Sequence, residues 1–303
     1  MAFPVANGYT QYSGNFIPEI WSGKLQVKFY KTTVFAEIAN TDWEGEIKGQ
    51  GDKVHIRTIP TITINSYTKG QNLTNQVPDS PPIELLIDKG KYFAVVLDDV
   101  DAVQTDIKLM DVFTNDATTQ MKISIDADVM NGVKAGAAAA NKGATAGAIS
   151  GNLNLGTDAA PRAVTKDNIL DLFLDAGQVL DEQNVPEDGR WLVIPAWMAS
   201  MVKRSDLKQA YLTGDSVSPL RNGKLGMIDR FMVYVSNNLP KTADGDSYLM
   251  AGTRDAITFA SQMTNVETLR AQTTFGNIVR GLNVYGYNVT KPEALVNMVA
   301  VKG

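Results

Sequence analysis

The sequence contains no cysteine and only one histidine, His55. Because cysteine is absent, disulfide bonds, thiolate zinc sites and thiol catalysis are excluded. A single histidine cannot build a metal site that depends on several imidazole ligands. A Ser–His–Asp triad would need His55 as its base, but this residue falls in the middle of a predicted strand, on the polar side. Carboxylates are the remaining candidates for catalysis.

An excess of basic residues and a long apolar run are also lacking. Lys and Arg number 28 against 33 Asp and Glu, so the formal net charge is −5, whereas a surface that coats nucleic acid is basic. No apolar run approaches the ~20 residues that span a bilayer, and the N-terminus lacks the basic segment and apolar core of a secretory signal. With 44% hydrophobic and 20% charged residues, we expect a globular protein made in a cytosol, with no membrane partner.

Motifs for phosphate and calcium binding are missing, and those for carboxylate chemistry are weak. The sequence has no G-x-x-x-x-G-K-[ST] motif. Asp244-Gly-Asp246 lacks the alternating ligands of a calcium loop and predicts a turn, while Asp98, Asp99 and Asp101 are better explained as the start of a helix. We therefore expect no cofactor and no metal. A carboxylate-dependent hydrolase stays open as an alternative, since 33 acidic residues always contain some pair.

Residues 46–97 have the pattern of a long β-hairpin. On the outgoing strand, residues that are polar except for Ile59 alternate with six positions of one parity, which are Val54, Ile56, Thr58, Pro60, Ile62 and Ile64. On the return strand, Ile83, Leu85 and Ile87 alternate with Glu84, Leu86 and Asp88. The segment 65–82 is rich in Asn, Ser, Thr, Gly and Pro and predicts the loop at the tip. Because a two-stranded ribbon is marginal alone, its apolar face needs either the chain's own core or a neighbouring subunit.

Residues 1–45 have the composition of an arm rather than of a core. Prolines and glycines are interspersed with aromatic residues, and a short helix is predicted from about Pro18 to Tyr30. Apolar segments without strong periodicity need a surface to lie against. That surface is either the chain's own domain or another subunit, and the sequence favours neither.

A long helix is predicted over residues 98–131. Apolar side chains recur there every three or four positions, at Val100, Val103, Ile107, Met110, Phe113, Ala117, Met121, Ile125 and Val129. No Pro or Gly intervenes before Gly132. At ~1.5 Å per residue the helix is on the order of 50 Å long, well beyond the usual ~10–14 residues. We expect a helix of this length to support other elements that pack along it.

The rest of the chain predicts a second unit and a return to strands. Residues 132–157 are rich in Gly, Ala, Asn, Ser and Thr and predict a frayed helix end, a flexible connector and a boundary. Residues 158–252 predict an α/β unit with helices at 165–183 and 196–205 and strands at 190–195, 227–236 and 248–251. Residues 253–303 predict further strands and turns. The fold class is α+β.

This order of parts resembles the major capsid protein of tailed bacteriophages, whose shell fold is named after phage HK97. Four stretches carry the resemblance, which covers essentially the whole chain. They are Phe16-Ile-Pro-Glu-Ile-Trp-Ser22, Arg190-Trp-Leu-Val-Ile-Pro195 before a short helix, residues 226–240, and the ending that runs from Phe275 through Gly281-Leu-Asn-Val-Tyr-Gly286 to Lys291-Pro-Glu-Ala-Leu295.

The resemblance implies an HK97-like capsid fold with four parts. Residues 1–45 would be the N-terminal arm and 46–97 the extended β-hairpin loop, which lies over a neighbouring subunit. Residues 98–157 and 253–303 would form the peripheral domain with its long spine helix, and 158–252 the α/β axial domain. The implied function is a structural shell protein that assembles as pentamers and hexamers into an icosahedral capsid around phage double-stranded DNA, without sequence-specific binding.

The resemblance also implies partners and subunit contacts. A portal is expected, and so is a separate scaffolding protein, because the Trp21 region comes too early in the chain for an N-terminal scaffold segment. Arg57, Lys69 and Glu84 are candidate subunit contacts because they are charged and close to the hairpin tip. Some relatives crosslink through a lysine of this loop, but no catalytic acid or acceptor asparagine is identifiable, so we expect no crosslink. An encapsulin-like nanocompartment shell is the alternative within the same fold.

Overall fold

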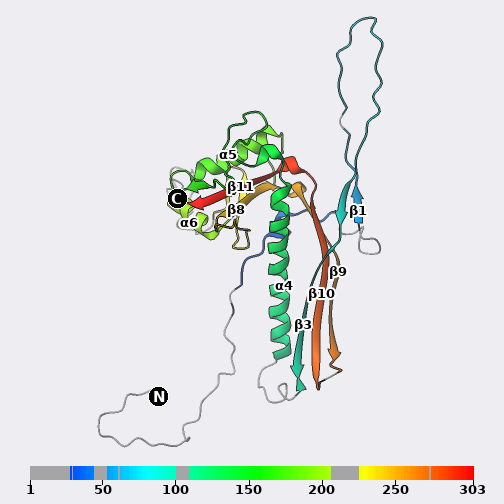
Figure 1. Cartoon of the computed structure of the whole chain (residues 1–303), viewed down its shortest axis with the longest axis vertical. Coiled ribbons are helices and arrows are strands. Elements are labelled where there is room, and N and C mark those ends of the chain that lie inside the picture. Colours follow the sequence, from blue (N-terminus) through cyan, green and yellow to red (C-terminus); the bar gives the residue numbers. More distant parts are fainter. Residues whose placement is uncertain are drawn as a thin grey trace, which may run out of the picture.

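The computed structural model describes residues 28, 30–43, 53–60, 62–99, 109–205, 225–272 and 274–303. These residues form two packed bodies and a projecting ribbon (Figure 1). One body is a six-stranded sheet with two helices, and the other is a long helix beside a three-stranded sheet. The α+β class and the HK97-like arrangement predicted from the sequence are confirmed.

The six-stranded sheet has the strand order β4-β11-β8-β5-β7-β6. In chain order its strands are β4 (Arg162–Val164), β5 (Arg190–Ile194), β6 (Met227–Ile228), β7 (Phe231–Val235), β8 (Ser247–Thr253) and β11 (Leu295–Lys302). The pairs β4/β11 and β5/β7 are parallel and the other neighbours are antiparallel. Every residue of β5 and β8 is buried, which indicates that both faces of the sheet are covered.

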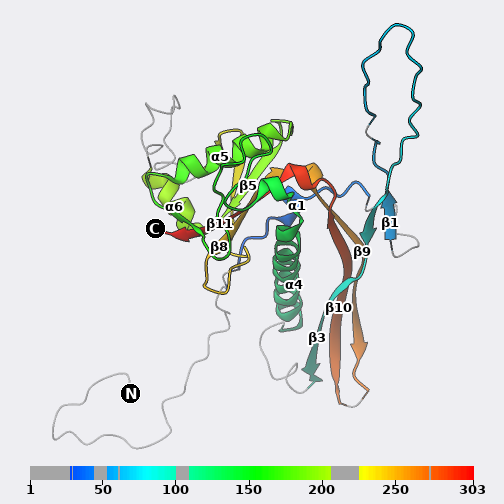
Figure 2. The ribbon, with the colours of Figure 1, turned by 45° about the horizontal axis from the view of Figure 1, so that its top comes forward.

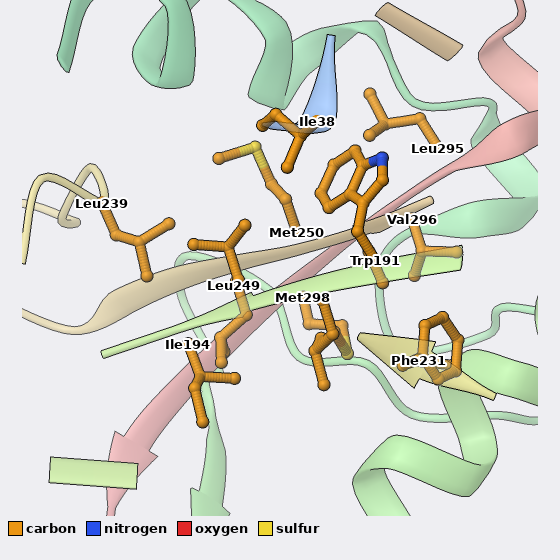
Figure 3. Packing of buried hydrophobic residues seen from close by; sticks show 14 of the residues in the cluster. Ile38, Trp191, Ile194, Phe231, Leu239, Leu249, Met250, Leu295, Val296 and Met298 are labelled. Carbon is orange, nitrogen blue, oxygen red and sulfur yellow. The ribbon is translucent and has the colours of Figure 1, made fainter. Parts of the chain in front are cut away.

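Two amphipathic helices pack against this sheet (Figure 2). They are α5 (Ile169–Glu182) and α6 (Ala196–Arg204), close to the bounds predicted from their apolar periodicity. In α5 the buried side chains recur at Ile169, Leu172, Phe173, Ala176, Val179 and Leu180. Figure 3 shows how Trp191 of β5, Met250 of β8 and Met298 of β11 fill the same core.

The second body is built on the antiparallel sheet β3-β10-β9. Its strands are β3 (Lys89–Asp98), β9 (Ile257–Arg270) and β10 (Gly276–Val289). The helix α4 (Leu109–Val133) runs beside this sheet (Figure 1). Asp128 of α4 joins the two, because its carboxylate accepts a 2.8 Å hydrogen bond from the Tyr285 hydroxyl and its carbonyl a 3.0 Å bond from the Tyr287 hydroxyl. Burial and the Asp128 carboxylate together raise the pKa of Tyr285.

The long helix is confirmed over its described part, Leu109–Val133, and its start near Asp98 stays a prediction. Asp98 is the last residue of β3, and the Asp99 amide donates to the Phe275 carbonyl across the tip of the sheet. Residues 100–108, including Val100, Val103 and Ile107, lie outside the described residues. The helix continues to Val133 and ends in a 3₁₀ turn, η1 (Lys134–Gly136).

The prediction of a loose connector at residues 132–157 is also wrong. This segment contains a second 3₁₀ turn, η2 (Ala139–Asn141), and folds back onto the six-stranded sheet. Asn141 is fully buried, and its Nδ2 donates to the carbonyls of Glu293 (2.6 Å) and Leu295 (3.0 Å). Small residues were read as a sign of disorder, whereas here they allow close packing: a Cβ on Gly156 would lie 2.1 Å from the Val299 carbonyl oxygen.

The carboxylate of Glu182 holds the turn that closes this segment. Its Oε2 accepts hydrogen bonds from the backbone amides of Ile149 (2.8 Å) and Ser150 (3.0 Å), and its Oε1 accepts one from Gln178 (2.9 Å). The Ser150 amide, the Gln178 side chain and the Ile149 amide lower the pKa of Glu182 to about 2. The charged form is thus the one that the fold binds.

We expect Glu182→Gln to lower the free energy of unfolding by about 1–2 kcal/mol at pH 7, because charge-assisted hydrogen bonds are weakened. The folded-state pKa is depressed, so the stabilisation is present above the ordinary glutamate pKa of about 4.3 and is lost as the pH falls through about 2. Urea unfolding of both proteins should therefore converge between pH 4 and 2. Asp244→Asn, at an exposed turn, serves as the control with no such trend.

One strand lies outside the body to which the sequence-based division of the chain assigns it. Residues 253–303 are predicted to lie with the long helix, and β9 and β10 do lie beside α4, but β11 lies in the six-stranded sheet. The break falls at η5 (Pro292–Ala294), where the chain crosses from one body to the other. At the other crossing, η4 (Arg254–Ala256) joins β8 to β9. Chain segments were grouped by adjacency in the sequence, whereas burial pairs β11 with β8.

The described part of the N-terminal arm packs on the chain's own core. The short helix α1 (Phe35–Ile38) places Ile38, which is fully buried, in the cluster that contains Trp191 (Figure 3). Phe35 lies against Phe259, with ring centroids 5.0 Å apart. The helix predicted from Pro18 to Tyr30 falls almost wholly outside the described residues. None of the described helices is long and apolar enough to cross a bilayer.

Candidate assembly surfaces

The projecting ribbon starts from a short antiparallel ladder. The strands β1 (Lys53–Ile56) and β2 (Ile83–Leu86) pair from Lys53↔Leu86 to Ile56↔Ile83. On the inner side, Ile56 and Leu85 are buried with Ile87 and Ala260 in a small separate cluster. This cluster fixes the base of the ribbon to the end of the three-stranded sheet, so the predicted hairpin is confirmed at its base.

Beyond this base the predicted strand does not continue. The ladder ends at Ile56 instead of reaching Ile64, and residues 57–82 form a long loop that extends away from both bodies (Figures 1 and 2). The arms of the loop are joined by side chains: Thr58 bonds with Ser80, and the Gln76 amide bonds both backbone groups of Thr63 at 2.7 and 3.1 Å. Prolines explain the difference, since Pro60 and the prolines of the return arm cannot donate to a ladder.

Large apolar side chains of this loop face solvent in the single chain. Ile59, Val77 and Ile64 are 95%, 93% and 89% exposed, and Ile62, Tyr67 and Leu73 are also exposed. Every residue from 62 to 79 is exposed. A soluble monomer rarely presents so many apolar side chains in one projecting element, and such surfaces mark contact sites for other molecules.

The three charged contact candidates occupy different parts of the ribbon. Lys69 is at the tip, in the turn that the Thr68 carbonyl and Gln71 amide close at 3.0 Å. Arg57 is exposed at the first position after β1 and forms no ion pair with a described residue. Glu84 lies at the base, where its Oε1 is 3.6 Å from Lys53 and 3.5 Å from His55 of the opposite strand. The structure therefore does not bring the three together.

A second exposed surface is the face of the three-stranded sheet turned away from α4. The register places Tyr92 opposite Leu282, and Val96 opposite Ile278, which in turn lies opposite Leu269. Tyr92 is 80% exposed, and Val96, Leu269 and Leu282 are also exposed. An Arg280–Glu267 ion pair lies between the two rows. Residues that directly face each other across strands share one side of the sheet, so these side chains form one apolar surface.

The far end of the same body carries a third exposed feature. Phe275, in the turn between β9 and β10, is 81% exposed. Beside it Arg270 makes a two-pronged ion pair with Asp99.

The long helix α4 is only partly covered. Its apolar side chains are fully buried in the C-terminal third, at Ile125, Val129, Met130 and Val133, while Val112 and Phe113 are exposed. Phe113, which belongs to the predicted apolar stripe of the helix, is thus not covered by the described part of the chain.

The residues considered as catalytic or metal-binding candidates give much weaker evidence of a functional site than these surfaces do. His55 is half exposed beside Glu84, with no serine or threonine hydroxyl bonded to it in the described residues. No group of three or more His, Asp or Glu side chains in the described part of the chain could hold a metal ion. At Asp244-Gly-Asp246, bonds of Thr242 with Asp246 form the turn that the sequence predicted. The exposed apolar surfaces are the features that distinguish this molecule.

A comparison with protein families provides independent evidence on the kind of protein. Residues 83–298 match the family described as phage capsid protein. The chain therefore belongs to the phage capsid protein family. A comparison with curated protein sequences finds no significant match.

Solved capsid structures resemble this chain over nearly its whole length. A structure from Mycobacterium phage Che8 has a TM-score of 0.79 and 30% sequence identity, and covers 93% of this chain and 97% of its own. The capsid of cyanophage P-SCSP1u has a TM-score of 0.74 at 16% identity, covering 99% and 97%. The mature capsid of bacteriophage PhiM1 has a TM-score of 0.70 at 14% identity, covering 94% and 92%.

The protein is thus a structural shell protein of a bacteriophage capsid, located in the virion. Its fold is the HK97-like fold that the sequence suggested. The hydrolase alternative receives no support from family or structure.

Proposed function

We propose that copies of this chain associate as pentamers and hexamers into an icosahedral shell that encloses phage double-stranded DNA. The observation that carries the proposal is the loop between β1 and β2, which extends away from both bodies (Figure 1) and exposes Ile59, Ile64 and Val77 almost completely. Burying a large aliphatic side chain contributes ~1.5–3 kcal/mol. In the single subunit these side chains stay in water, whereas contact with a neighbouring copy would bury them.

The two bodies then take different places in the shell. The body of α4, β3, β9 and β10 acts as the peripheral domain, with α4 as its spine helix. The six-stranded sheet with α5 and α6 acts as the axial domain around the fivefold and quasi-sixfold axes, and it includes β11 as well as residues 158–252. The N-terminal arm, of which residues 30–43 lie on the core, and the hairpin reach toward neighbouring subunits.

Among the charged candidates, Arg57 and Lys69 suit subunit contacts better than Glu84 does. Both are exposed and lack an ion-pair partner in the described part of the chain. Glu84 is engaged by its own chain, through Lys53 and His55 and through its carbonyl, which accepts a 2.7 Å bond from Asn288. We propose that Arg57 and Lys69 contact a neighbouring copy and that Glu84 mainly orients the ribbon base.

The remaining partners follow from shell assembly inside a host cell. We propose synthesis in the host cytoplasm, a separate scaffolding protein and a portal. The net charge of −5 suits DNA that is enclosed without sequence-specific binding, since few phosphates are neutralised. The mechanism is association rather than catalysis, and no covalent crosslink is expected, so mature shells should give a single band on a denaturing gel.

Assembly and the role of the hairpin can be tested together. Purified protein is separated into subunit and shell fractions by size exclusion, checked by electron microscopy and treated briefly with trypsin. We expect cleavage after Lys69 in free subunits, because the loop is exposed and unpaired, and strong protection in shells. Lys69→Gln removes the cut in subunits and confirms the site. A protein that stays monomeric at high concentration, or shells cut as fast as subunits, would contradict the proposal.

A further inference from the structure

A polar pocket lies between the end of α4, the folded-back segment and the six-stranded sheet, outside the hairpin. It has a volume of about 480 Å³, and its polar lining includes Lys134, Lys142, Asp158, Tyr248 and Asn297. These residues come from η1, the segment after η2, β8 and β11. A volume many times the ~30 Å³ share of one water molecule leaves room for the side chains of an approaching segment.

Two lysines supply positive charge that the subunit itself does not neutralise. The Lys134 ammonium group sits 4.3 Å from the ring centre of Tyr248, and Lys142 Nζ donates to the Ala135 carbonyl at 3.1 Å. Neither forms an ion pair with a carboxylate of the described residues. The one acid in the lining is Asp158, whose carboxylate lies near Tyr248 and, after burial, is the main cause that raises the pKa of the Tyr248 hydroxyl. The pocket therefore keeps about one net positive charge.

Asn297 adds an unsatisfied polar group at the same place. The residue is only 8% exposed, and its Oδ1 is buried with no hydrogen-bond partner in the described chain. A backbone bridge between Lys142 and Asn297 holds the two side by side. Asn297 lines the pocket, and the Nδ2 end of its amide is a donor that an incoming acceptor group can use.

We propose that this pocket receives an acidic side chain from a neighbouring copy of the chain, a proposal that rests on the proposed shell assembly. Two ammonium groups and one amide donor match the acceptor oxygens of a carboxylate. The chain has more acidic than basic residues, 33 against 28, so neighbouring copies offer carboxylates in excess. A DNA duplex fits less well, since its regularly spaced phosphates are bound by a stripe of cations rather than at one pocket.

The test compares two double variants. Lys134→Met with Lys142→Met removes the charge and keeps the length of both side chains. Lys166→Met with Lys291→Met is the control, because these lysines already pair with Asp167 and Asp255 of their own chain. The critical concentration for assembly is measured by light scattering at low and high salt. We expect a rise of at least about tenfold for the pocket variant at low salt, a weaker salt dependence, and a change within about twofold for the control.

A third variant, Asn297→Asp, keeps both lysines and places a carboxylate inside the pocket. It should reproduce the assembly defect, while thermal unfolding of the subunit stays close to that of the wild type. Wild-type assembly behaviour in the pocket variant, or equal defects in pocket and control variants, would overturn the inference and leave shell formation intact. Loss of binding to duplex DNA fragments with normal assembly would also overturn it, in favour of a phosphate ligand. Failure of the wild-type protein to assemble would instead contradict the proposed function.

Discussion

Replacing Ile59, Ile64 and Val77 by serine is expected to abolish shell assembly while leaving the subunit folded. These side chains are at least 89% exposed in the single chain, so their removal costs the subunit almost no packing. In the shell each would bury an aliphatic group that contributes ~1.5–3 kcal/mol. Together they contribute about 4–9 kcal/mol per copy, and 1.4 kcal/mol corresponds to tenfold in an equilibrium constant. The critical concentration should therefore rise at least about a thousandfold, as measured by sedimentation velocity.

A matched control lies in the same loop. Asn65, Asn72 and Asn75 are exposed polar residues, and their replacement by serine changes the loop by the same number of positions without removing apolar surface. This control variant should assemble like the wild type, and both triple variants should unfold within ~2 °C of it. If the isoleucine and valine variant still forms shells at the wild-type concentration, the loop is not an apolar contact element and its exposure needs another explanation.

The largest loss of subunit stability is expected from Asp126→Leu. This residue of α4 is fully buried, and its Oδ1 accepts hydrogen bonds from the backbone amides of Val34 and Phe35, both at 2.9 Å. Its Oδ2 accepts a 2.6 Å bond from Asn238 Nδ2. An unsatisfied buried donor costs ~1–3 kcal/mol, so three of them are expected to lower the free energy of unfolding by about 3–6 kcal/mol. Urea unfolding followed by tryptophan fluorescence gives the value.

Asp116→Asn provides the comparison on the same helix. Asp116 also binds the N-terminal segment, through Lys28 at 2.9 Å and Tyr30 at 2.8 Å, but its contacts are exposed to solvent. Because ion pairs exposed to solvent contribute little to stability, this variant should differ little from the wild type. Equal losses for the two variants would show that the attachment of the arm, rather than the burial of Asp126, determines the stability.

Elements with strong local periodicity were predictable from the sequence. Apolar spacing predicted a helix at residues 165–183, where α5 is found with one buried face, and Ile125 and Val129 of α4 are buried as the helical period requires. The hairpin base was predictable because Ile56 lies between the polar residues His55 and Arg57, and because apolar residues recur at every second position of the return strand. In each case the burial of a residue follows a short repeat, of three or four positions in a helix and of two positions in a strand.

Elements whose conformation depends on contacts between residues far apart in the sequence were not predicted. The Gly- and Ala-rich stretch at 132–157 has the composition of a linker, and only its packing against β11 shows why Gly156 must be small. The placement of β11 depends on its pairing with β8. The pocket around Asn297 could not be predicted either, since it combines residues from 134 to 299 that share no motif. The exposed hairpin was predictable as a need for a partner, but the residues that meet the partner were not.

The short ladder at the base of the ribbon has a geometric consequence. Only four residue pairs, from Lys53↔Leu86 to Ile56↔Ile83, tie the ribbon into a regular sheet, and side-chain bonds alone link the arms beyond them. Tilting the loop at Ile56 and Ile83 therefore breaks no backbone ladder and disturbs no core side chain beyond the small cluster. The pentamers and hexamers proposed above would bring identical copies together at unequal angles, and a ribbon that tilts at its base would fit both arrangements.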